Sequence, residues 1–351
     1  MNKKLIEFIH KDCNAVIVKN VNRLSDLKNQ CLLITGGTGF MGTWLTEIVS
    51  FLNDNYNFNT KLILLSERAH NFSDKAPHLA MRNDIVFLTR GITSVVEIPE
   101  EVTMIIHAAA TPDNRLHASE PLNTAQVIVS GTAALLAAAS RLPNLKRMVN
   151  VSSGLVYGSQ PFNLDAMPEN YCGGPDCSSA SSAYAEGKRF AETLCGIYRN
   201  QYKMPIINVR PFAFIGPYQL LDRPWAINNF IHDSFLGGPI RILGDGETVR
   251  SYMYPSDMAF WILRILVDGI IGKSYNIGSP YGITLSQLAN KIADNFAEKP
   301  QIISGILPQS SIKRSKFVPN IDLAKETIGL SITVNIDEAI KRTLSWHRQL
   351  I

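Results

Sequence analysis

A glycine-rich turn constrains this chain most. Residues 34–42 read Ile-Thr-Gly-Gly-Thr-Gly-Phe-Met-Gly, between an apolar run and a helical segment. Gly36 permits a tight turn, Gly39 lets the backbone come close to a pyrophosphate, and Gly42 lets a helix pack closely. A pyrophosphate is then held by free N–H groups at the positive end of that helix. The turn predicts a dinucleotide site made by Gly36, Thr38, Gly39, Phe40, Met41 and Gly42.

Short apolar runs alternate with helical segments along most of the chain. This alternation is typical of a parallel sheet that is covered by helices on both faces. The predicted fold is therefore α/β, a Rossmann-type doubly wound parallel sheet with a smaller mixed C-terminal substrate-binding lobe. The expected strands are 31–35, 61–65, 85–88, 103–107, 147–151, 206–210 and 274–277, and the expected helices are 43–52, 125–141, 182–202, 258–267, 285–296 and 336–346.

The domain boundaries follow from changes in this pattern. Residues 1–30 precede the first clear strand and form an N-terminal extension, with a short strand expected at 15–18. Residues 31–210 form the dinucleotide-binding domain, joined by about 252–278. Prolines and a Gly-Asp-Gly turn break up the chain after Arg210, so residues 211–351 are mainly the substrate-binding lobe.

Composition and charge exclude several classes of partner. The net charge is only +4 in 351 residues, and no long basic run exists, so we expect no nucleic-acid partner. The most promising membrane segment, 260–271, is interrupted by Arg264 and Asp268, and we expect no membrane association. The five cysteines have no zinc-binding spacing, so no metal is expected, and their sparse use fits a reducing cytoplasm.

The end of the second expected strand bears on which dinucleotide is bound. An acidic residue there would accept hydrogen bonds from a ribose 2′-hydroxyl and favour NAD, whereas an arginine would pair with a 2′-phosphate and favour NADP. The chain offers both, as Glu67 and Arg68, with Ser66 at the position where the acid is expected. The sequence leaves NAD and NADP both open.

A serine, a tyrosine and a lysine form the candidate catalytic group. Tyr184 and Lys188 are four residues apart in an expected helix and so share one face, and Ser153 follows the expected strand 147–151. A phenol with a pKa near ~10 is a poor base at neutral pH, and a nearby ammonium group lowers that pKa. The phenol can then exchange a proton with a substrate hydroxyl while a nicotinamide exchanges hydride with the same carbon.

Taken together, these motifs resemble the NAD-dependent epimerase/dehydratase family of extended short-chain dehydrogenases. The resemblance covers roughly residues 31–346. It implies a Rossmann domain, a nicotinamide cofactor, a nucleoside-diphosphate sugar as substrate and a homodimer formed through the helices 125–141 and 182–202. The matching segments are Thr35 to Gly42, His107-Ala108-Ala109-Ala110, Ser152 to Gly158, Tyr184 to Lys188, Arg210-Pro211 with Gly216-Pro217, and Gly244-Asp245-Gly246 leading to Arg250.

The resemblance also assigns roles to single residues. It makes Ser153, Tyr184 and Lys188 catalytic, and lets Ala108, Ala109 and Ala110 line the cofactor together with Tyr184 and Lys188. Asn229 would contact the nucleotide part of the substrate. A guanidinium after a Gly-Asp-Gly turn suits phosphate oxygens, so Arg250 is the candidate for the diphosphate, with Arg241 as a second candidate. The alternative for Arg250 is a surface salt bridge to Asp257 or another acid.

Departures from the family pattern narrow the expected reaction. Related 4,6-dehydratases carry an Asp-Glu pair directly after the catalytic serine, and UDP-glucuronate decarboxylases carry the glutamate. Gly154 and Leu155 stand there instead and cannot transfer protons. At three other positions the family usually has a polar residue, and this chain has Ile92, Ile128 and Ala213 instead. We expect oxidoreduction at C4 of a nucleoside-diphosphate hexose, as a 4-epimerase or a 4-keto-6-deoxyhexose reductase. The alternatives are a dehydratase that uses other residues and a non-catalytic nucleotide-binding relative.

Overall fold

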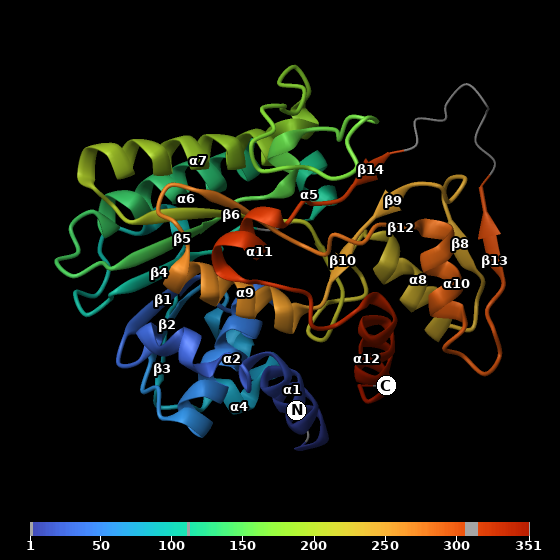
Figure 1. Cartoon of the computed structure of the whole chain (residues 1–351), viewed down its shortest axis with the longest axis horizontal. Coiled ribbons are helices and arrows are strands. Elements are labelled where there is room, and N and C mark those ends of the chain that lie inside the picture. The colour runs from blue at the N-terminus through green and yellow to red at the C-terminus, as the bar shows by residue number, and fades with distance from the viewer. Residues whose placement is uncertain (1–2, 111–112, 306–314, 351) are drawn as a thin grey trace.

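A seven-stranded parallel sheet forms the centre of the molecule (Figure 1). The computed structural model describes residues 3–110, 113–305 and 315–350. The strand order is β11-β6-β5-β4-β1-β2-β3, and each neighbouring pair is parallel. The predicted Rossmann-type sheet is therefore confirmed. Its strands are β1 (Cys31–Thr35), β2 (Lys61–Leu65), β3 (Ile85–Leu88), β4 (Met104–His107), β5 (Arg147–Val151), β6 (Ile206–Pro211) and β11 (Ser274–Ile277).

Both faces of the sheet are buried, which explains why its strands are apolar runs rather than alternating ones. Successive side chains of a strand point to opposite faces. In β1, Leu32 and Ile34 enter one apolar core, whereas Leu33 enters a second core on the other face.

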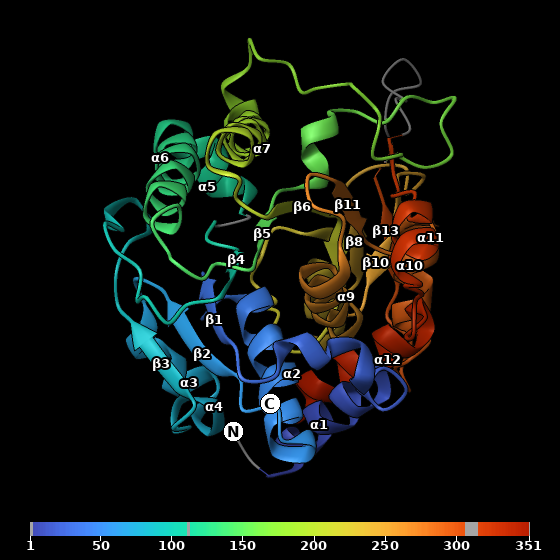
Figure 2. The ribbon, with the colours of Figure 1, turned by 60° about the vertical axis from the view of Figure 1, so that its left-hand side comes forward.

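Helices cover these two faces (Figure 2). On one side, α2 (Phe40–Tyr56) packs against α9 (Pro255–Asp268). On the other side, α6 (Pro121–Ala139) packs along α7 (Ala183–Tyr202). Among the described helices, α6 alone is long and apolar enough to cross a membrane by length and composition. The segment 260–271, expected to be the most promising membrane segment, is therefore the wrong one. The 19 residues of α6 carry no charged side chain, whereas 260–271 contains Arg264 and Asp268.

The N-terminal segment is a helix, so the strand expected at 15–18 is wrong. The helix α1 (Lys3–Ile17) packs on α2 and α9. Its buried residues follow helical spacing, with Leu5, Ile9, Cys13 and Val16 all in the core that lies under α2. A short 3-10 helix, η1 (Val21–Leu27), follows α1.

The remaining elements build a smaller lobe beside the carboxyl ends of the strands. A separate apolar core holds this lobe together, with Phe230, Leu288 and Leu344 among its fully packed residues. Its elements are β7 (Ala213–Phe214), α8 (Ala226–Phe235), β8 (Ile240–Ile242), β9 (Val249–Arg250), β10 (Tyr252–Met253), β12 (Ile283–Thr284), α10 (Leu285–Ala293), β13 (Ile302–Ser304), β14 (Lys316–Phe317) and α12 (Ile336–Arg348). The helix α11 (Asp322–Ile328) packs on α9 and β11 instead, with Ala324 and Ile328 in the main core.

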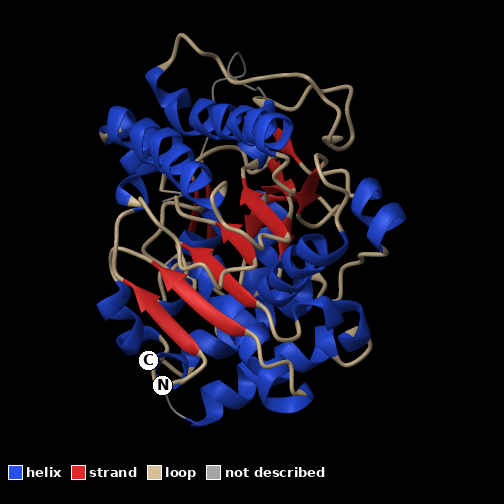
Figure 3. Cartoon of the chain, turned by 90° about the vertical axis from the view of Figure 1, so that its left-hand side faces the viewer, coloured by secondary structure: helices blue, strands red, loops and turns tan. Residues whose placement is uncertain are grey.

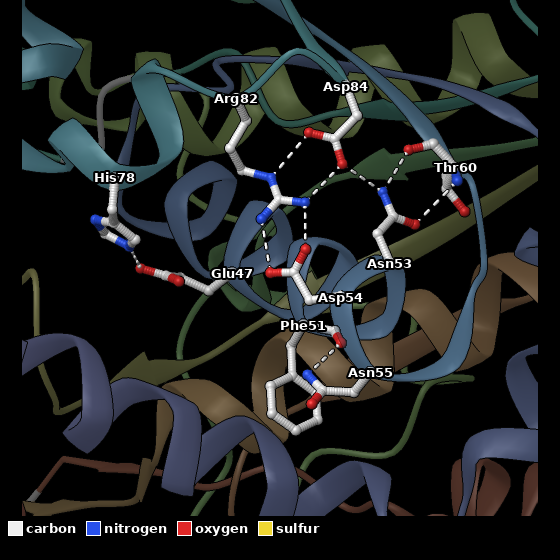
Figure 4. A network of polar contacts seen from close by, with 9 residues as sticks. All are labelled: Glu47, Phe51, Asn53, Asp54, Asn55, Thr60, His78, Arg82 and Asp84. Atoms are coloured by element: carbon white, nitrogen blue, oxygen red, sulfur yellow. Dashed lines mark hydrogen bonds and ion pairs between the residues drawn. The ribbon is translucent and has the colours of Figure 1, made fainter.

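A polar network fixes the far end of α2 against the sheet (Figure 4). The guanidinium of Arg82 binds both carboxylate oxygens of Asp54 on α2 and both of Asp84 just before β3. Asn53 donates to the Asp84 carboxylate and to the Thr60 carbonyl, which precedes β2. The network anchors α2, whose opposite end carries the glycine turn. The short helices α3 (Phe72–Lys75) and α4 (Pro77–Ala80) lie between β2 and β3.

Candidate functional site

The predicted cofactor-binding turn and the catalytic residues lie at the carboxyl ends of the sheet's strands, which all run in the same direction (Figure 3). The glycine turn follows β1, Ala108 follows β4, and Ser153 follows β5. The strand order reverses between β1 and β4, which is the point where open parallel sheets bind their ligands.

The glycine turn has the geometry that a pyrophosphate requires. Gly36 has φ +67°, and a Cβ at this position would lie 2.7 Å from the Ala108 carbonyl oxygen, so only glycine fits. A Cβ at Gly42 would lie 2.4 Å from the carbonyl oxygen of Gly37. Gly39 is the N-cap of α2 and has no side chain to cap the first N–H groups. These groups remain open to an anion, so the residues present fit a dinucleotide.

The adenosine end of the site has hydroxyl groups where NAD enzymes place an acid. The Ser66 hydroxyl, directly after β2, is 2.7 Å from the Thr38 hydroxyl. The Glu67 carboxylate lies beside Gly91, beyond the end of β3, with its Oε1 2.5 Å from where a Gly91 Cβ would be. Arg68 is exposed. Lys75, which the sequence argument missed, donates to the Thr38 and Gly39 carbonyls at 3.2 Å and forms no ion pair with a described acid.

The candidate catalytic residues lie together and are buried. Tyr184 forms a hydrogen bond with Ser153, and the Lys188 Nζ lies 6.0 Å from the centre of the Tyr184 ring. Lys188 donates to the Val151 carbonyl at 2.7 Å, which holds the α7 lysine against the end of β5. The ring of Tyr184 packs on Ile128 of α6.

The acidity of this group differs from the sequence expectation. Burial raises the pKa of Tyr184 to about 12, and the hydrogen bond with Ser153 opposes that rise. The prediction that Lys188 lowers the pKa of Tyr184 is therefore wrong for this structure. The loss of solvation raises this pKa more than the ammonium group, 6.0 Å from the ring centre, could lower it. Burial also lowers the pKa of Lys188 to about 8. Without ligand, the phenol form of Tyr184 is the stable one at neutral pH.

The two positions that carry acids in dehydratases cannot act as acids here. A Cβ at Gly154 would lie 2.9 Å from the ring of Phe212, so the site has no room for a side chain. Leu155 is exposed and apolar, in the place where decarboxylases carry a glutamate.

The structure separates the three candidate substrate contacts. Arg250 is partly buried on β9 and donates to the Ser315 hydroxyl and carbonyl. The alternative salt bridge between Arg250 and Asp257 is wrong, because the Asp257 carboxylate accepts the backbone N–H of Val334 instead. Arg241 is exposed and lies 3.9 Å from the carboxylate of Asp233. Asn229 is exposed on α8.

One aromatic contact of Tyr184 was not foreseen. The ring of His117, on α5 (Asn114–Ser119), stacks on the Tyr184 ring with 4.2 Å between centroids. The two residues are 67 positions apart, and no local motif links them.

The parallel sheet, the glycine turn and the Ser-Tyr-Lys group define an extended short-chain dehydrogenase/reductase. The model of the NAD-dependent epimerase/dehydratase family matches residues 32–278, and the chain belongs to this family. The family resemblance and the nicotinamide dinucleotide cofactor inferred from the sequence are thereby confirmed, and the protein is an NAD-dependent enzyme of this type.

Known relatives show how this family varies. UDP-glucuronic acid decarboxylase 5 of Arabidopsis thaliana is 28% identical over 312 residues, which is 89% of this chain and 87% of the relative. UDP-glucuronic acid 4-epimerase of Bacillus cereus, solved with UDP-glucuronic acid and NAD, has a similar structure, with a TM-score of 0.77 and 22% identity over 92% of this chain and all of that one. UDP-glucose 4-epimerase of Thermotoga maritima has a TM-score of 0.75 and 21% identity, covering 92% of this chain and 99% of that chain.

Proposed function

We propose that this protein is a 4-epimerase, which oxidises and then reduces C4 of a hexose carried by a nucleoside diphosphate. Two features together carry this proposal. The Ser153–Tyr184–Lys188 group is intact, and the next position, Gly154, has no room for a side chain because of Phe212. The group can move a proton at one oxygen. The closed position leaves no acid to remove water or to protonate a second carbon.

The chemistry assigned to the residues is a proton exchange at one hydroxyl. Ser153 donates a hydrogen bond to the C4 oxygen and holds it beside the Tyr184 hydroxyl. Tyr184 takes the proton of the C4 hydroxyl and returns a proton to the C4 oxygen after the keto sugar has turned over. Lys188 favours, by its charge, the phenolate form of Tyr184 that accepts this proton. A bound nicotinamide supplies the place where hydride is held between the two half-reactions.

The substrate class is supported by one cation and by the relatives. Arg250 is partly buried, and burial lowers its pKa. No ion pair joins it to an acid among the described residues. A diphosphate would supply the missing negative charge and could bind the guanidinium with two hydrogen bonds. Relatives named as decarboxylases and epimerases act on UDP-sugars, as their names state. We assign the diphosphate to Arg250 in preference to Arg241, which already lies beside Asp233.

A 4-keto-6-deoxyhexose reductase is the second candidate, and Ser66 is the observation that favours it. An enzyme that consumes NADPH needs room for a 2′-phosphate, and Ser66 replaces the acid that would repel one. Both reactions use the same three catalytic residues.

The quaternary structure and location are part of the proposal. We infer a homodimer that pairs α6 and α7 of two chains, supported by apolar residues such as Leu122 and Phe190 that these helices expose. We infer a cytoplasmic location, supported by the free thiols of the exposed Cys172 and Cys177.

A panel of nucleotide sugars tests the reaction. The purified protein is incubated with UDP-, dTDP- and GDP-hexoses, with and without added NAD or NADPH. An epimerase converts a hexose into its C4 epimer without consuming cofactor. Loss of reduced-nicotinamide absorbance in proportion to product, with a 4-keto sugar as substrate, identifies the reductase instead. A 4-keto-6-deoxy product or released carbon dioxide would refute both, and so would full activity in Tyr184→Phe.

A further inference from the structure

The rings of His117 and Tyr184 shield each other. Their planes are inclined by 15° with 4.2 Å between centroids, which is a stacked pair. His117 is 6% exposed and Tyr184 8% exposed, although Tyr184 is the residue that must meet a substrate. Tyr184 shares a small apolar cluster with Ile128 of α6 and Ala191 of α7, against which Ala110 packs. The imidazole of His117, from α5, therefore covers one face of the Tyr184 ring.

The helix α5, which carries His117, is held in place at its N-terminus by Asp113. Asp113 is the N-cap of α5 and accepts the backbone N–H of Arg115 at 3.0 Å. Its carboxylate also pairs with the Arg115 side chain and with Arg223, which reaches across from the segment between β7 and α8 at 2.8 Å. These hydrogen bonds lower the pKa of Asp113, first through Arg115, so the carboxylate is charged at neutral pH. The position of α5 is thus tied to the smaller lobe.

We propose that His117 is a positioning residue for Tyr184. Its stacked ring sets the orientation in which the phenol meets Ser153, and it keeps water from one face of the phenol. The proposal rests on the proposed function in that Tyr184 is taken to act on a substrate hydroxyl. Lys188 of α7 is the charged group that lies near the Tyr184 ring, and Ser153 supplies the hydrogen bond. From α6, the apolar Ile128 packs in the same cluster. On α5 itself the charged groups are Asp113, which is paired, and Arg115.

Removal of the imidazole has a definite consequence for acidity. Burial is the main cause that raises the pKa of Tyr184 to about 12. In His117→Ala, water reaches one face of the ring and solvates the phenolate, so the pKa of Tyr184 falls towards its ordinary value. In His117→Phe, the cover and the stacking remain, so this pKa stays close to that of the wild type. A residue that only stabilised the fold would not move this pKa.

Two measurements on the full-length protein test the proposal. The first titrates tyrosinate absorbance in wild type, His117→Ala and His117→Phe, each with Tyr184→Phe as the subtracted background. We expect the Tyr184 transition at lower pH in His117→Ala and at an unchanged pH in His117→Phe. This titration needs no turnover, so it remains informative if the proposed reaction fails. Identical transitions in wild type and His117→Ala would overturn the proposal.

The second measurement compares kcat and KM on the nucleotide sugar that the panel identifies. The loss of an aromatic pair predicts a kcat about three- to tenfold lower in His117→Ala with KM nearly unchanged, and recovery of most of that loss in His117→Phe. Circular dichroism confirms that each variant is folded. If His117→Ala does not fold, His117→Gln takes its place, because its flat amide covers less of the ring. If His117→Phe is folded and its kcat is as low as that of His117→Ala, the stacking role of His117 is contradicted.

Discussion

Ser66 stands where an acid would meet the 2′-hydroxyl of an NAD ribose. Its hydroxyl and that of Thr38 are 2.7 Å apart, and Glu67 is directed towards Gly91. Lys75 brings a cation to the glycine turn, because its ammonium group donates to the carbonyls of Thr38 and Gly39. Hydroxyl and ammonium groups tolerate a 2′-phosphate that a carboxylate would repel.

Ser66→Asp is expected to shift the cofactor preference towards NAD. The new carboxylate accepts hydrogen bonds from the two ribose hydroxyls and repels a phosphate, so the ratio of NADPH to NADH dissociation constants should rise about tenfold or more, equivalent to one charged hydrogen bond. Fluorescence titration of both reduced cofactors measures this ratio. Ser66→Asn is the matched control, because it has the same shape without the charge. An unchanged ratio in Ser66→Asp would show that position 66 does not face the ribose.

Gly154 is limited by the ring of Phe212, which lies 2.9 Å from where its Cβ would be. Gly154→Asp is therefore expected to lower the free energy of unfolding by about 1–3 kcal/mol, the usual cost of overpacking. Denaturant unfolding measures the loss. Leu155→Ser, at an exposed neighbour, should change stability little. Gly154→Asp that unfolds like the wild type would show that Phe212 moves aside readily, and the argument against an acid at this position would fail.

At the scale of whole elements, the pair α6 and α7 carries the proposed dimer. Phe190 is 49% exposed on α7, and Leu122 is 80% exposed on α6. Burying a charge between apolar helices is costly, so Phe190→Glu should convert a dimer into a monomer in light scattering after size-exclusion chromatography. Leu243→Glu is the control, since residue 243 is 91% exposed on the other lobe. The proposed interface is wrong if Phe190→Glu leaves the assembly unchanged.

Most strands were predictable because each is a buried apolar run that ends in a glycine or polar residue. The strand β1 has the bounds expected, and β4 begins one residue later. The segment 15–18 misled the prediction, because four apolar residues in a row fit a strand as well as a helix. The signal that could have found α1 is the helical spacing of Leu5, Ile9 and Cys13, which is diluted by the polar residues between them.

Some features of the candidate site could likewise be predicted from the sequence, and others could not. The glycine turn and the pair Tyr184 and Lys188 are local patterns, so the sequence reveals them directly. The stacking of His117 on Tyr184 depends on how α5 packs on α7, and the blocked position at Gly154 depends on Phe212, 58 residues away. The pKa of Tyr184 depends on burial, which no motif contains. Contacts of this kind follow from tertiary packing alone.

At the scale of the whole molecule, both ends of the chain close around the same core. Asp12 of α1 accepts a hydrogen bond from Tyr254 at 2.5 Å and one from Arg342 of α12 at 2.6 Å. Burial raises the pKa of Asp12 to about 6 despite these partners. The N-terminal helix is thus tied to the C-terminal helix through a buried carboxylate.

Buried His107 links folding to pH. It lies between the Thr35 and Thr132 hydroxyls at 2.7 and 3.1 Å, and burial lowers its pKa to about 3. Because the folded pKa is below that of the unfolded chain, its contribution to stability is complete above about pH 6.5 and is lost as pH falls towards 3. The expected slope is about 1.4 kcal/mol per pH unit in that window.

The comparison of wild type with His107→Gln isolates this slope. Asp12 and Asp257 have raised pKa values of about 6, so they change stability in the opposite direction and must be cancelled by the comparison. Denaturant unfolding at several pH values should show a shallower acid decline in His107→Gln, whatever its absolute stability. Parallel declines in the two proteins would mean that His107 becomes protonated without unfolding.

Product formation in D₂O tests the central claim most directly, since hydride transfer confined to C4 leaves the other ring carbons untouched. The protein is incubated with the nucleotide hexose that it converts, and the product is examined by NMR. We predict the C4 epimer with no deuterium at C5 or C6, and no product from Tyr184→Phe. A product with solvent deuterium at C5 or C6, or one formed equally well by Tyr184→Phe, would contradict the account.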